Sequence, residues 1–367
     1  MRPERRGYFK MADAVGSNPP GLDIVLGAGS SYEVKLPVGL GLAKTIATKL
    51  DVRIGDHGKN VGEGDKYLLG QFQNHHPQQF NDYLRAGWRI RDGLPTASSI
   101  DDFLDMHSHD ELMQTIGKAA IVRSIIEAER ESDLYFDPND RSKRLGLEKL
   151  EGSWFMRFVR VLGRGISKNN APQIFDNVSF VVFNYDRCVE FFLLQALQAM
   201  YSLPLNDAAS IVQDLSIIHP YGTVGELSDL GNGTQVPFGG IENYDFNYIK
   251  LAQRIRTYTE QVAGSEITNG IRNEIERAEQ VVFLGFAYHA QNMLLLRPFE
   301  EFASSRPIYG TALGMSNSDV TIAKGELRSW FMPNDIFPSD PIESIHIENQ
   351  LTCAKLFDNY AKSIAGG

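Results

Sequence analysis

Cysteine is scarce in this chain of 367 residues, in which only Cys188 and Cys353 occur. Two thiols so far apart in the sequence exclude a disulfide framework, and they cannot supply the four sulfur ligands of a thiolate zinc site. Such low cysteine usage is typical of proteins from a reducing compartment, so we expect a cytoplasmic location. We also expect no bound metal.

Long apolar runs and an excess of basic residues are lacking as well. No segment approaches the roughly 20 consecutive apolar residues that a membrane-spanning helix needs, so we expect no membrane association. The 36 Lys and Arg residues are outnumbered by 46 Asp and Glu, which gives a formal net charge of −10. That balance disfavours nucleic-acid binding as the main function. Residues 1–20 are basic without an apolar core, and we expect a flexible leader there rather than a secretory signal.

An apolar run at residues 22–26 ends in the turn Gly27-Ala28-Gly29, which two serines follow. An apolar strand with such a turn is how a parallel α/β sheet presents backbone N–H groups to a phosphate. Glycine allows the sharp turn and a close approach of ligand to backbone. Ser30 and Ser31 are expected to donate to phosphate oxygens or to cap the next helix. The spacing matches neither GxGxxG nor a Walker A loop, so a purely structural role stays open.

Three later segments, 178–190, 215–222 and 279–287, each contain a short apolar or β-branched run that ends in a polar or glycine-containing tip. Such runs are typical of buried parallel strands. The tips carry Asn184-Tyr185-Asp186, His219 and Gly285-Phe286. Ligands of open α/β sheets bind at the carboxyl ends of the strands, so we expect these tips to converge on one crevice.

Hydrophobic residues make up 43% of the chain, enough for one large core, and we expect residues 21–367 to form a single α/β domain. Its fold class would be a Rossmann-like, doubly wound parallel sheet. Residues 40–50 have helical periodicity and are expected to pack under the phosphate loop. The patterns at 67–92, 99–131 and 145–167 predict a mostly helical insert over about 57–175, which forms a smaller lobe. Two further strands are expected at 306–313 and 343–349, and a closing helix follows them.

In this order, GAGSS, FNYD, a strand-end histidine with a glycine shortly after it, and FLGF resemble the sirtuin-like fold. The chain is most similar to the sirtuin-like NAD-cleaving domains of bacterial antiphage defence systems. Pro37 lies where that family has a G-x-P segment. The resemblance covers residues 20–315. It implies that NAD⁺ is the substrate and that the NAD⁺-binding residues are Gly27, Ala28, Gly29, Ser30, Ser31, Pro37, Tyr185, Asp186, Gly285 and Phe286.

The resemblance also implies that Asn184 and His219 are the catalytic pair. Nicotinamide leaves NAD⁺ as a neutral molecule and needs no acid, so the enzyme must hold the ribose, position a water and accept its proton. The amide of Asn184 can donate and accept, and it can order a water and a ribose hydroxyl together. His219 titrates near neutrality and is expected to be the general base. Asp186 is expected to hold the nicotinamide amide, to cap the helix that starts at Arg187, or to do both.

Other candidate groups have a structural explanation in the sequence. Ser99 with Asp102 three residues later predicts a helix N-cap, and Asp101 and Asp102 are then expected to interact with the helix dipole. His107 and His109 would face different sides of a helix, which favours a solvated surface over a metal site. His289 follows the late strand, and whether it lines the pocket stays open. Cys188 has no flanking base and is not expected to be a nucleophile.

The chain departs from the family in two places. Sirtuin deacylases have a structural zinc module built from two CxxC pairs, which this chain lacks, and that disfavours deacylation of proteins. Ala287-Tyr288-His289 replaces the family's Ser-x-x-Asp, so the ribose and adenine contacts there do not carry over. The expected function is NAD⁺ hydrolysis as an effector of antiphage defence, in a homo-oligomer or with a co-encoded ATPase or sensor subunit. The alternatives are an ADP-ribosyltransferase or deacylase, and a non-enzymatic subunit that binds NAD⁺ or ADP-ribose.

Overall fold

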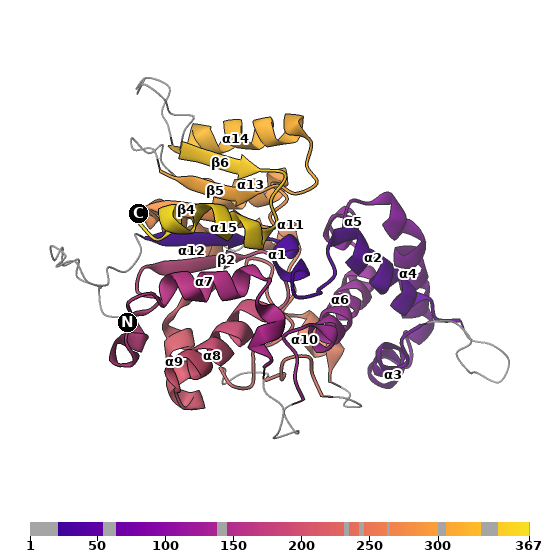
Figure 1. The fold of residues 1–367 in the computed structure, drawn as a ribbon. Helices are drawn as coiled ribbons and strands as arrows, with labels where there is room; N and C mark the ends of the chain where they lie inside the picture. The colour runs from indigo at the N-terminus through magenta and orange to yellow at the C-terminus, as the bar shows by residue number, and fades with distance from the viewer. Residues whose placement is uncertain are drawn as a thin grey trace.

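Six parallel strands form one sheet at the centre of the computed structural model (Figure 1). The structure describes residues 21–53, 64–137, 145–230, 235–241, 246–262, 265–299, 306–331 and 344–366. The expected leader, residues 1–20, lies outside these ranges. The strands are β1 (Leu22–Leu26), β2 (Val178–Val182), β3 (Ser216–Ile218), β4 (Gln280–Leu284), β5 (Ile308–Thr311) and β6 (Ile345–Glu348). Their order is β3-β2-β1-β4-β5-β6, which confirms the predicted Rossmann-like, doubly wound parallel sheet.

Helices occupy most of the remaining described chain. The N-terminal half contains α1 (Ala28–Tyr32), α2 (Gly39–Leu50), α3 (Lys66–His75), α4 (Phe80–Gly93), α5 (Ile100–Met106), α6 (Glu111–Glu131) and α7 (Trp154–Leu162). The C-terminal half contains α8 (Cys188–Tyr201), α9 (Leu205–Asp214), α10 (Tyr248–Ala252), α11 (Tyr258–Val262), α12 (Ser265–Arg277), α13 (Ala290–Leu296), α14 (Asn317–Phe331) and α15 (Cys353–Ile364). Short 3-10 helices are η2 (Leu94–Thr96), η3 (Leu147–Leu150) and η4 (Lys168–Gln173). The strands and the closing helix fall where the sequence predicts them.

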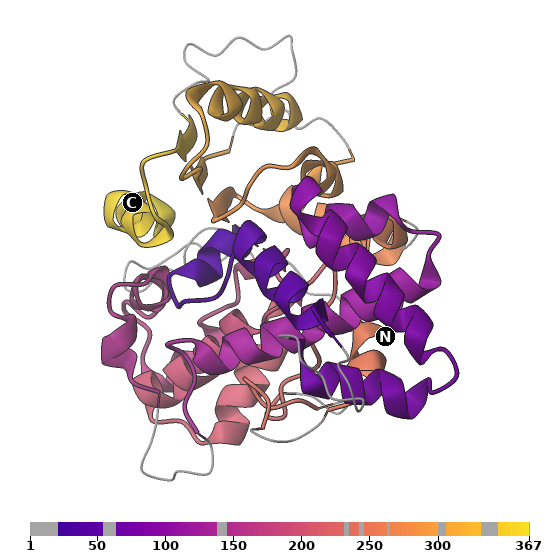
Figure 2. The ribbon, with the colours of Figure 1, turned by 90° about the vertical axis from the view of Figure 1, so that its right-hand side faces the viewer.

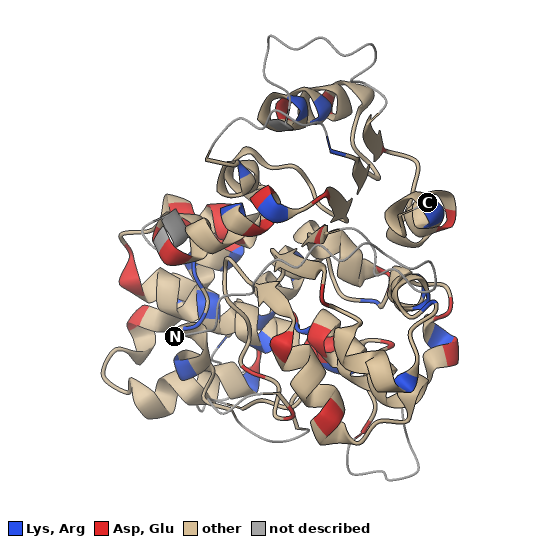
Figure 3. Cartoon of the chain, turned by 90° about the vertical axis from the view of Figure 1, so that its left-hand side faces the viewer, with Lys and Arg blue, Asp and Glu red and all other residues tan. Residues whose placement is uncertain are grey.

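Both faces of the sheet are buried. Successive side chains of a strand point to opposite faces, and Ile24 and Val25 of β1 accordingly lie in two different hydrophobic clusters. Val282 and Phe283 of β4 divide in the same way. One cluster is completed by α7, α8, α9 and α15, and the other by α12, α13, α14 and the N-terminal helices. This two-sided burial explains why the strands are mostly apolar. Acidic and basic residues are interspersed over the helices (Figure 3).

Helices α2 to α6 form a separate lobe beside the carboxyl ends of the strands (Figures 1 and 2). The expected insert over 57–175 matches this lobe in part, although residues 57–63 and 138–144 lie outside the described chain. Helix α7 does not belong to the lobe, because it packs against α8 and α15 beside the sheet. Helix α2 contacts α4 and α6 and so belongs to the lobe, whereas the sequence predicted that it packs under the phosphate loop.

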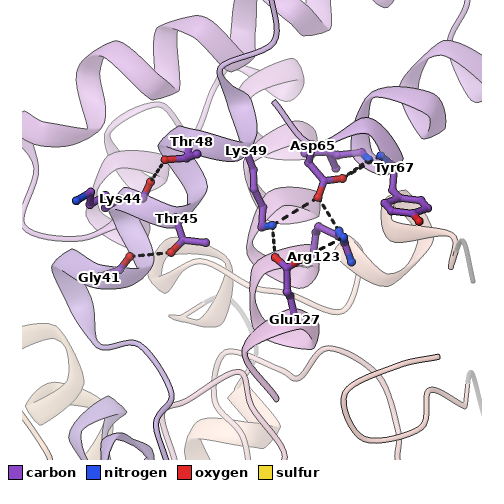
Figure 4. Close-up of polar contacts among 10 residues, drawn as sticks. Gly41, Lys44, Thr45, Thr48, Lys49, Asp65, Tyr67, Arg123 and Glu127 are labelled. Atoms are coloured by element: carbon purple, nitrogen blue, oxygen red, sulfur yellow. Dashed lines mark hydrogen bonds and ion pairs between the residues drawn. The ribbon is translucent and has the colours of Figure 1, made fainter. Parts of the chain in front are cut away.

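Four charged side chains join three helices of the lobe (Figure 4). Asp65, the N-cap of α3, accepts from Arg123 Nε at 2.8 Å and lies 3.5 Å from Lys49 Nζ of α2. Glu127, one turn after Arg123 on α6, also contacts Lys49. Burial alone would raise the pKa of Asp65, but the charge of Arg123 and its hydrogen bonds lower it overall. The acids and bases compensate one another, so this cluster fixes the lobe and leaves no charge for a ligand.

Candidate functional site

A cavity of about 730 Å³ lies at the carboxyl ends of the strands, between the sheet and the helical lobe. The segments that follow β1, β2, β4 and β5 form the sheet side. Residues of α2, α5 and α6, with Tyr258 of α11, form the opposite side. The strand order reverses between β1 and β4, and ligands of open α/β sheets bind at such a crossover. The volume is in the range of small-molecule sites.

Most of the predicted site residues come together in the wall of this cavity. They are Gly27, Ala28, Gly29, Pro37, Asn184, Tyr185, Asp186, Gly285 and Phe286. His289, whose position the sequence left open, also lines it. Ser30, Ser31 and His219 do not. The strand tips therefore converge as predicted, but not every polar group at the tips faces the shared space.

Asn184 lies at the centre of a small buried network. Its Nδ2 donates to Ser31 Oγ at 3.1 Å and, more weakly, to Ser30 Oγ at 3.4 Å. The hydroxyl of Ser30 in turn donates to the carbonyl of Gly27 at 2.8 Å, and that of Ser31 donates to Asp186 Oδ1 at 3.1 Å. The side chain of Asn184 is therefore fixed by its nitrogen, while its buried Oδ1 has no hydrogen-bond partner among the described residues. A buried acceptor without a partner in a cavity wall is suited to a donor on a bound molecule.

Neither role that the sequence predicts for Ser30 and Ser31 is seen. Helix α1 begins at Ala28, so its N-cap is Gly27 and not a serine. Both hydroxyls are buried and engaged in the network around Asn184. The two serines orient the amide, and they do not point into the cavity as phosphate donors.

The glycines of the β1 turn allow two strand ends to meet backbone to backbone. The amide of Gly27 donates to Leu284 O and that of Gly29 donates to Gly285 O, both at 3.0 Å. A Cβ on Gly29 would lie 2.8 Å from the Cα of Gly285, whose own φ is +58°. The glycines of this turn therefore have the structural role that the sequence left open. These two amides bind β4 and its tip, so they are not available to a phosphate.

His219 follows β3, and both nitrogens of its ring are engaged. Nδ1 lies 3.1 Å from the carbonyl oxygen of Asn184, and Nε2 lies 2.9 Å from a carboxylate oxygen of Glu190. Both oxygens accept, so both nitrogens carry a proton and the ring is cationic. Burial alone would lower the pKa of His219, but the charge of Glu190 and these hydrogen bonds raise it overall. The predicted general-base role does not fit this geometry, because the ring has no free nitrogen to receive a proton. His219 instead holds the backbone of Asn184.

Asp186 and Tyr185 lie beside Asn184 and have different partners. Asp186 Oδ1 accepts from the amide of Cys188 at 3.1 Å, so the helix-capping role proposed for it is present at the start of α8. Burial raises the pKa of Asp186. The hydroxyl of Tyr185 crosses to the lobe and donates to Asp101. Tyr185 therefore connects the β2 tip to α5.

Three carboxyl groups in the cavity wall, those of Glu33, Asp101 and Asp102, were not predicted as site residues. Ser99 Oγ accepts from the amide of Asp102 at 3.1 Å, which confirms the predicted N-cap of α5, but Asp101 next to it faces the cavity. Burial raises the pKa of Asp101 to about 6. Glu33 accepts at 2.8 Å from the amides of Trp154 and Ala354, at the N-termini of α7 and α15. These partners are 121 and 321 residues away, so no local pattern could indicate them.

A buried ion pair joins the β2 tip to α6. Glu129 is completely buried and pairs with Arg187, whose Nε lies 3.0 Å from Glu129 Oε1. The other oxygen of Glu129 also accepts from the amide of Gly239 at 3.0 Å, and Arg187 Nη1 donates to the carbonyl of Val236 at 2.6 Å. The charges are thus fully compensated, and the pair anchors the lobe rather than a ligand. Sequence reasoning did not find it.

The two thiols are unsuited to nucleophilic chemistry. Cys353 lines the cavity, but burial raises its pKa to about 12. Burial also raises the pKa of Cys188 well above its usual range, in agreement with the structural role expected for it. In the described parts of the chain, no three side chains of His, Cys, Asp or Glu gather in a way that could hold a metal ion.

Helices long and apolar enough to cross a membrane do not occur among the described residues. Comparisons of the chain with protein-family models, with curated proteins and with solved structures found no match.

Proposed function

We propose that the chain binds NAD⁺ in this cavity and hydrolyses the bond between nicotinamide and ribose, which gives nicotinamide and ADP-ribose. The observation that carries the proposal is the buried, unpartnered Oδ1 of Asn184 in the cavity wall at the strand crossover. Its amide nitrogen is held by Ser30 and Ser31, so the oxygen is fixed in advance of binding. An acceptor held in this way can order a ribose hydroxyl or the attacking water.

Aromatic side chains near Asn184 fit the planar nicotinamide ring. Phe183, Phe286 and Tyr221 all line the cavity. The ring of Phe183 lies 5.2 Å from that of Phe286 and 5.8 Å from that of Tyr221, centroid to centroid. A pyridinium is a flat cation, and aromatic faces attract such ions. The transition state has oxocarbenium character at the ribose, so placing the ring and the sugar is the main task of the site.

The sirtuin-like resemblance extends the proposal to biological role. We propose that the enzyme is a regulated effector of antiphage defence that depletes cellular NAD⁺. Its activity would depend on assembly, either with further copies of itself or with a co-encoded ATPase or sensor subunit.

Purified protein incubated with NAD⁺, followed by chromatography of the products, tests the proposal. We expect nicotinamide and ADP-ribose in equal amounts from the parent chain. Asn184→Ala should remove turnover. Asn184→Asp should also fail, because a carboxylate cannot donate the hydrogen bonds to Ser30 and Ser31 that fix the side chain. Asn206→Asp, on the exposed surface of α9, is the matched control and should keep the parent rate.

The outcome also separates the alternatives. ADP-ribose that remains attached to protein would indicate a transferase. Binding of NAD⁺ in calorimetry without any product would indicate a regulatory subunit. Absence of both binding and turnover would refute the proposal, as would full activity of Asn184→Asp.

A further inference from the structure

NAD⁺ hydrolysis needs a group that accepts a proton from the attacking water, and few groups of the cavity wall can do so. Both oxygens of Glu33 already accept backbone amides at two helix N-termini. The thiol of Cys353 and the hydroxyl of Tyr221 stay protonated at neutral pH, because burial raises the pKa of each. His219 lies outside the wall, and both of its nitrogens are engaged.

His289 also lines the wall, but it is exposed and its ring makes no hydrogen bond among the described residues that would orient it. Asp102 already accepts a hydrogen bond from the hydroxyl of Ser98. Two carboxyl groups of the wall, Asp186 and Asp101, remain as candidates.

Asp186 is less suited than its position suggests. Its Oδ1 receives two hydrogen bonds, from the hydroxyl of Ser31 and from the amide of Cys188. The residue is only 5% exposed, whereas Asp101 is partly exposed. Asp186 holds the network around Asn184 and caps α8, so its carboxyl is already engaged in two structural contacts.

Asp101 has the position and the bonding that a general base needs. It lies in the first turn of α5, on the side of the cavity opposite the strand tips. One carboxylate oxygen accepts from Tyr185, which follows Asn184 directly in the chain, so the carboxyl is oriented from the same strand tip. Burial raises the pKa of Asp101 to about 6, close to the range in which a base works at neutral pH.

The surroundings of Asp101 contain no cation in direct contact among the described residues. Asp102 and Asp105 of the same helix raise its pKa further, while the hydrogen bond from Tyr185 lowers it. The other titratable groups near it are Tyr221 and Tyr258, which also line the cavity.

We propose that Asp101 is the general base of the hydrolysis, an inference that rests on the proposed function. The oxygen of water forms a bond to ribose C1′ while the bond from C1′ to the nicotinamide nitrogen breaks. The electron pair of the broken bond neutralises the pyridinium, and the proton of the water moves to the carboxylate of Asp101. Solvent then removes that proton, so the products are nicotinamide, ADP-ribose and one H⁺. The lobe thus supplies the base, and the sheet supplies Asn184.

The test compares the pH profile of nicotinamide release for the parent, Asp101→Asn and Asp105→Asn. For the parent, kcat/KM should fall as the pH drops below about 6, because a protonated Asp101 cannot accept a proton. Asp101→Asn should lose about 10²–10⁴ in rate and lose this pH dependence, while its affinity for NAD⁺ changes little. Asp105 also lies on α5 but does not line the cavity, so its variant should keep the parent rate within about twofold.

Azide distinguishes a base from a residue that only shapes the site. The azide anion attacks without losing a proton, so it should restore nicotinamide release in Asp101→Asn and give ADP-ribosyl azide. Parent rate in Asp101→Asn, or a loss that azide does not rescue, overturns the assignment of Asp101 while hydrolysis by the parent stands. A parent that releases no nicotinamide overturns the proposed function itself, and the assignment with it.

Discussion

Asp23 offers a sharp test of the sheet, because it is a fully buried acid in the second position of β1. One carboxyl oxygen accepts from Ser179 Oγ at 3.1 Å, and the other has no hydrogen-bond partner among the described residues. Burial raises the pKa of Asp23 to about 8. In the unfolded chain an aspartate has a pKa of about 3.9. The folded protein therefore keeps a proton on Asp23 at neutral pH that the unfolded chain releases.

The sign of the effect follows from this proton. Stability is greatest below the unfolded pKa, and it falls as the pH rises from about 4 to about 8. Each pH unit in that window costs about 1.4 kcal/mol, so the loss at pH 7 is about 4 kcal/mol. Asparagine has nearly the same shape and does not titrate. We therefore expect Asp23→Asn to be up to about 4 kcal/mol more stable than the parent at pH 7, and the gain to shrink by about 3 kcal/mol at pH 5.

Thermal unfolding followed by circular dichroism at pH 5 and pH 7 measures this gain. With an unfolding entropy of about 2.1 cal/mol/K per residue, 4 kcal/mol in a chain of 367 residues raises the melting temperature by about 5 °C. Asp82→Asn, at an acid on the surface of α4 whose side chain is 51% exposed, is the matched control and should change it by less than about 1 °C. A gain that is the same at both pH values would refute the reasoning, and so would no gain at pH 7.

Three other substitutions test the anchors of the site. Gly285→Ala should abolish folding or lower the melting temperature severely, because its φ is +58° and the new Cβ would lie 2.0 Å from the backbone nitrogen of Ser30. Soluble yield and thermal unfolding measure this effect. Arg187→Met should cost about 3–5 kcal/mol in urea unfolding by leaving Glu129 buried without a counter-charge, and Glu129→Met in the same chain should recover part of the loss. His219→Ala should lower the melting temperature more at pH 6 than at pH 9, because the raised pKa makes the ion pair with Glu190 stabilising at low pH and lost as the pH rises. Equal losses at the two pH values would contradict the cationic state of His219.

The strands and the position of the cavity could be predicted because they depend on local sequence. A strand buried on both faces is an apolar run, and parallel strands bring their carboxyl ends to the same edge of the sheet. The tips at Asn184, Asp186 and Gly285 were therefore identified together from the sequence, and all three line the cavity. Helix caps are equally local, and the prediction for Ser99 is confirmed for the same reason.

Hydrogen-bond partners could not be predicted, because they depend on contacts between distant parts of the chain. The bond between Asn184 and Ser31 spans 153 residues, and that between Tyr185 and Asp101 spans 84. The sequence identifies the residue types that can donate or accept a hydrogen bond. Which donor pairs with which acceptor is seen only in the three-dimensional structure. The roles predicted for Ser31 and His219 changed for this reason, while the positions of their backbones did not.

The chain from residue 184 to residue 187 explains how the site is joined to the rest of the fold. Asn184 bonds to the serines after β1, Tyr185 to Asp101 on α5, Asp186 to the start of α8, and Arg187 to α6. The strand before them, β2, is paired on both sides by β1 and β3, so the segment starts from a rigid position. Asn184 and Tyr185 are adjacent in the chain. The strand tip that presents the unpartnered Oδ1 of Asn184 therefore also orients the carboxyl of Asp101. The free-energy cost of ordering these side chains is met during folding, so little reorganisation remains when a substrate binds.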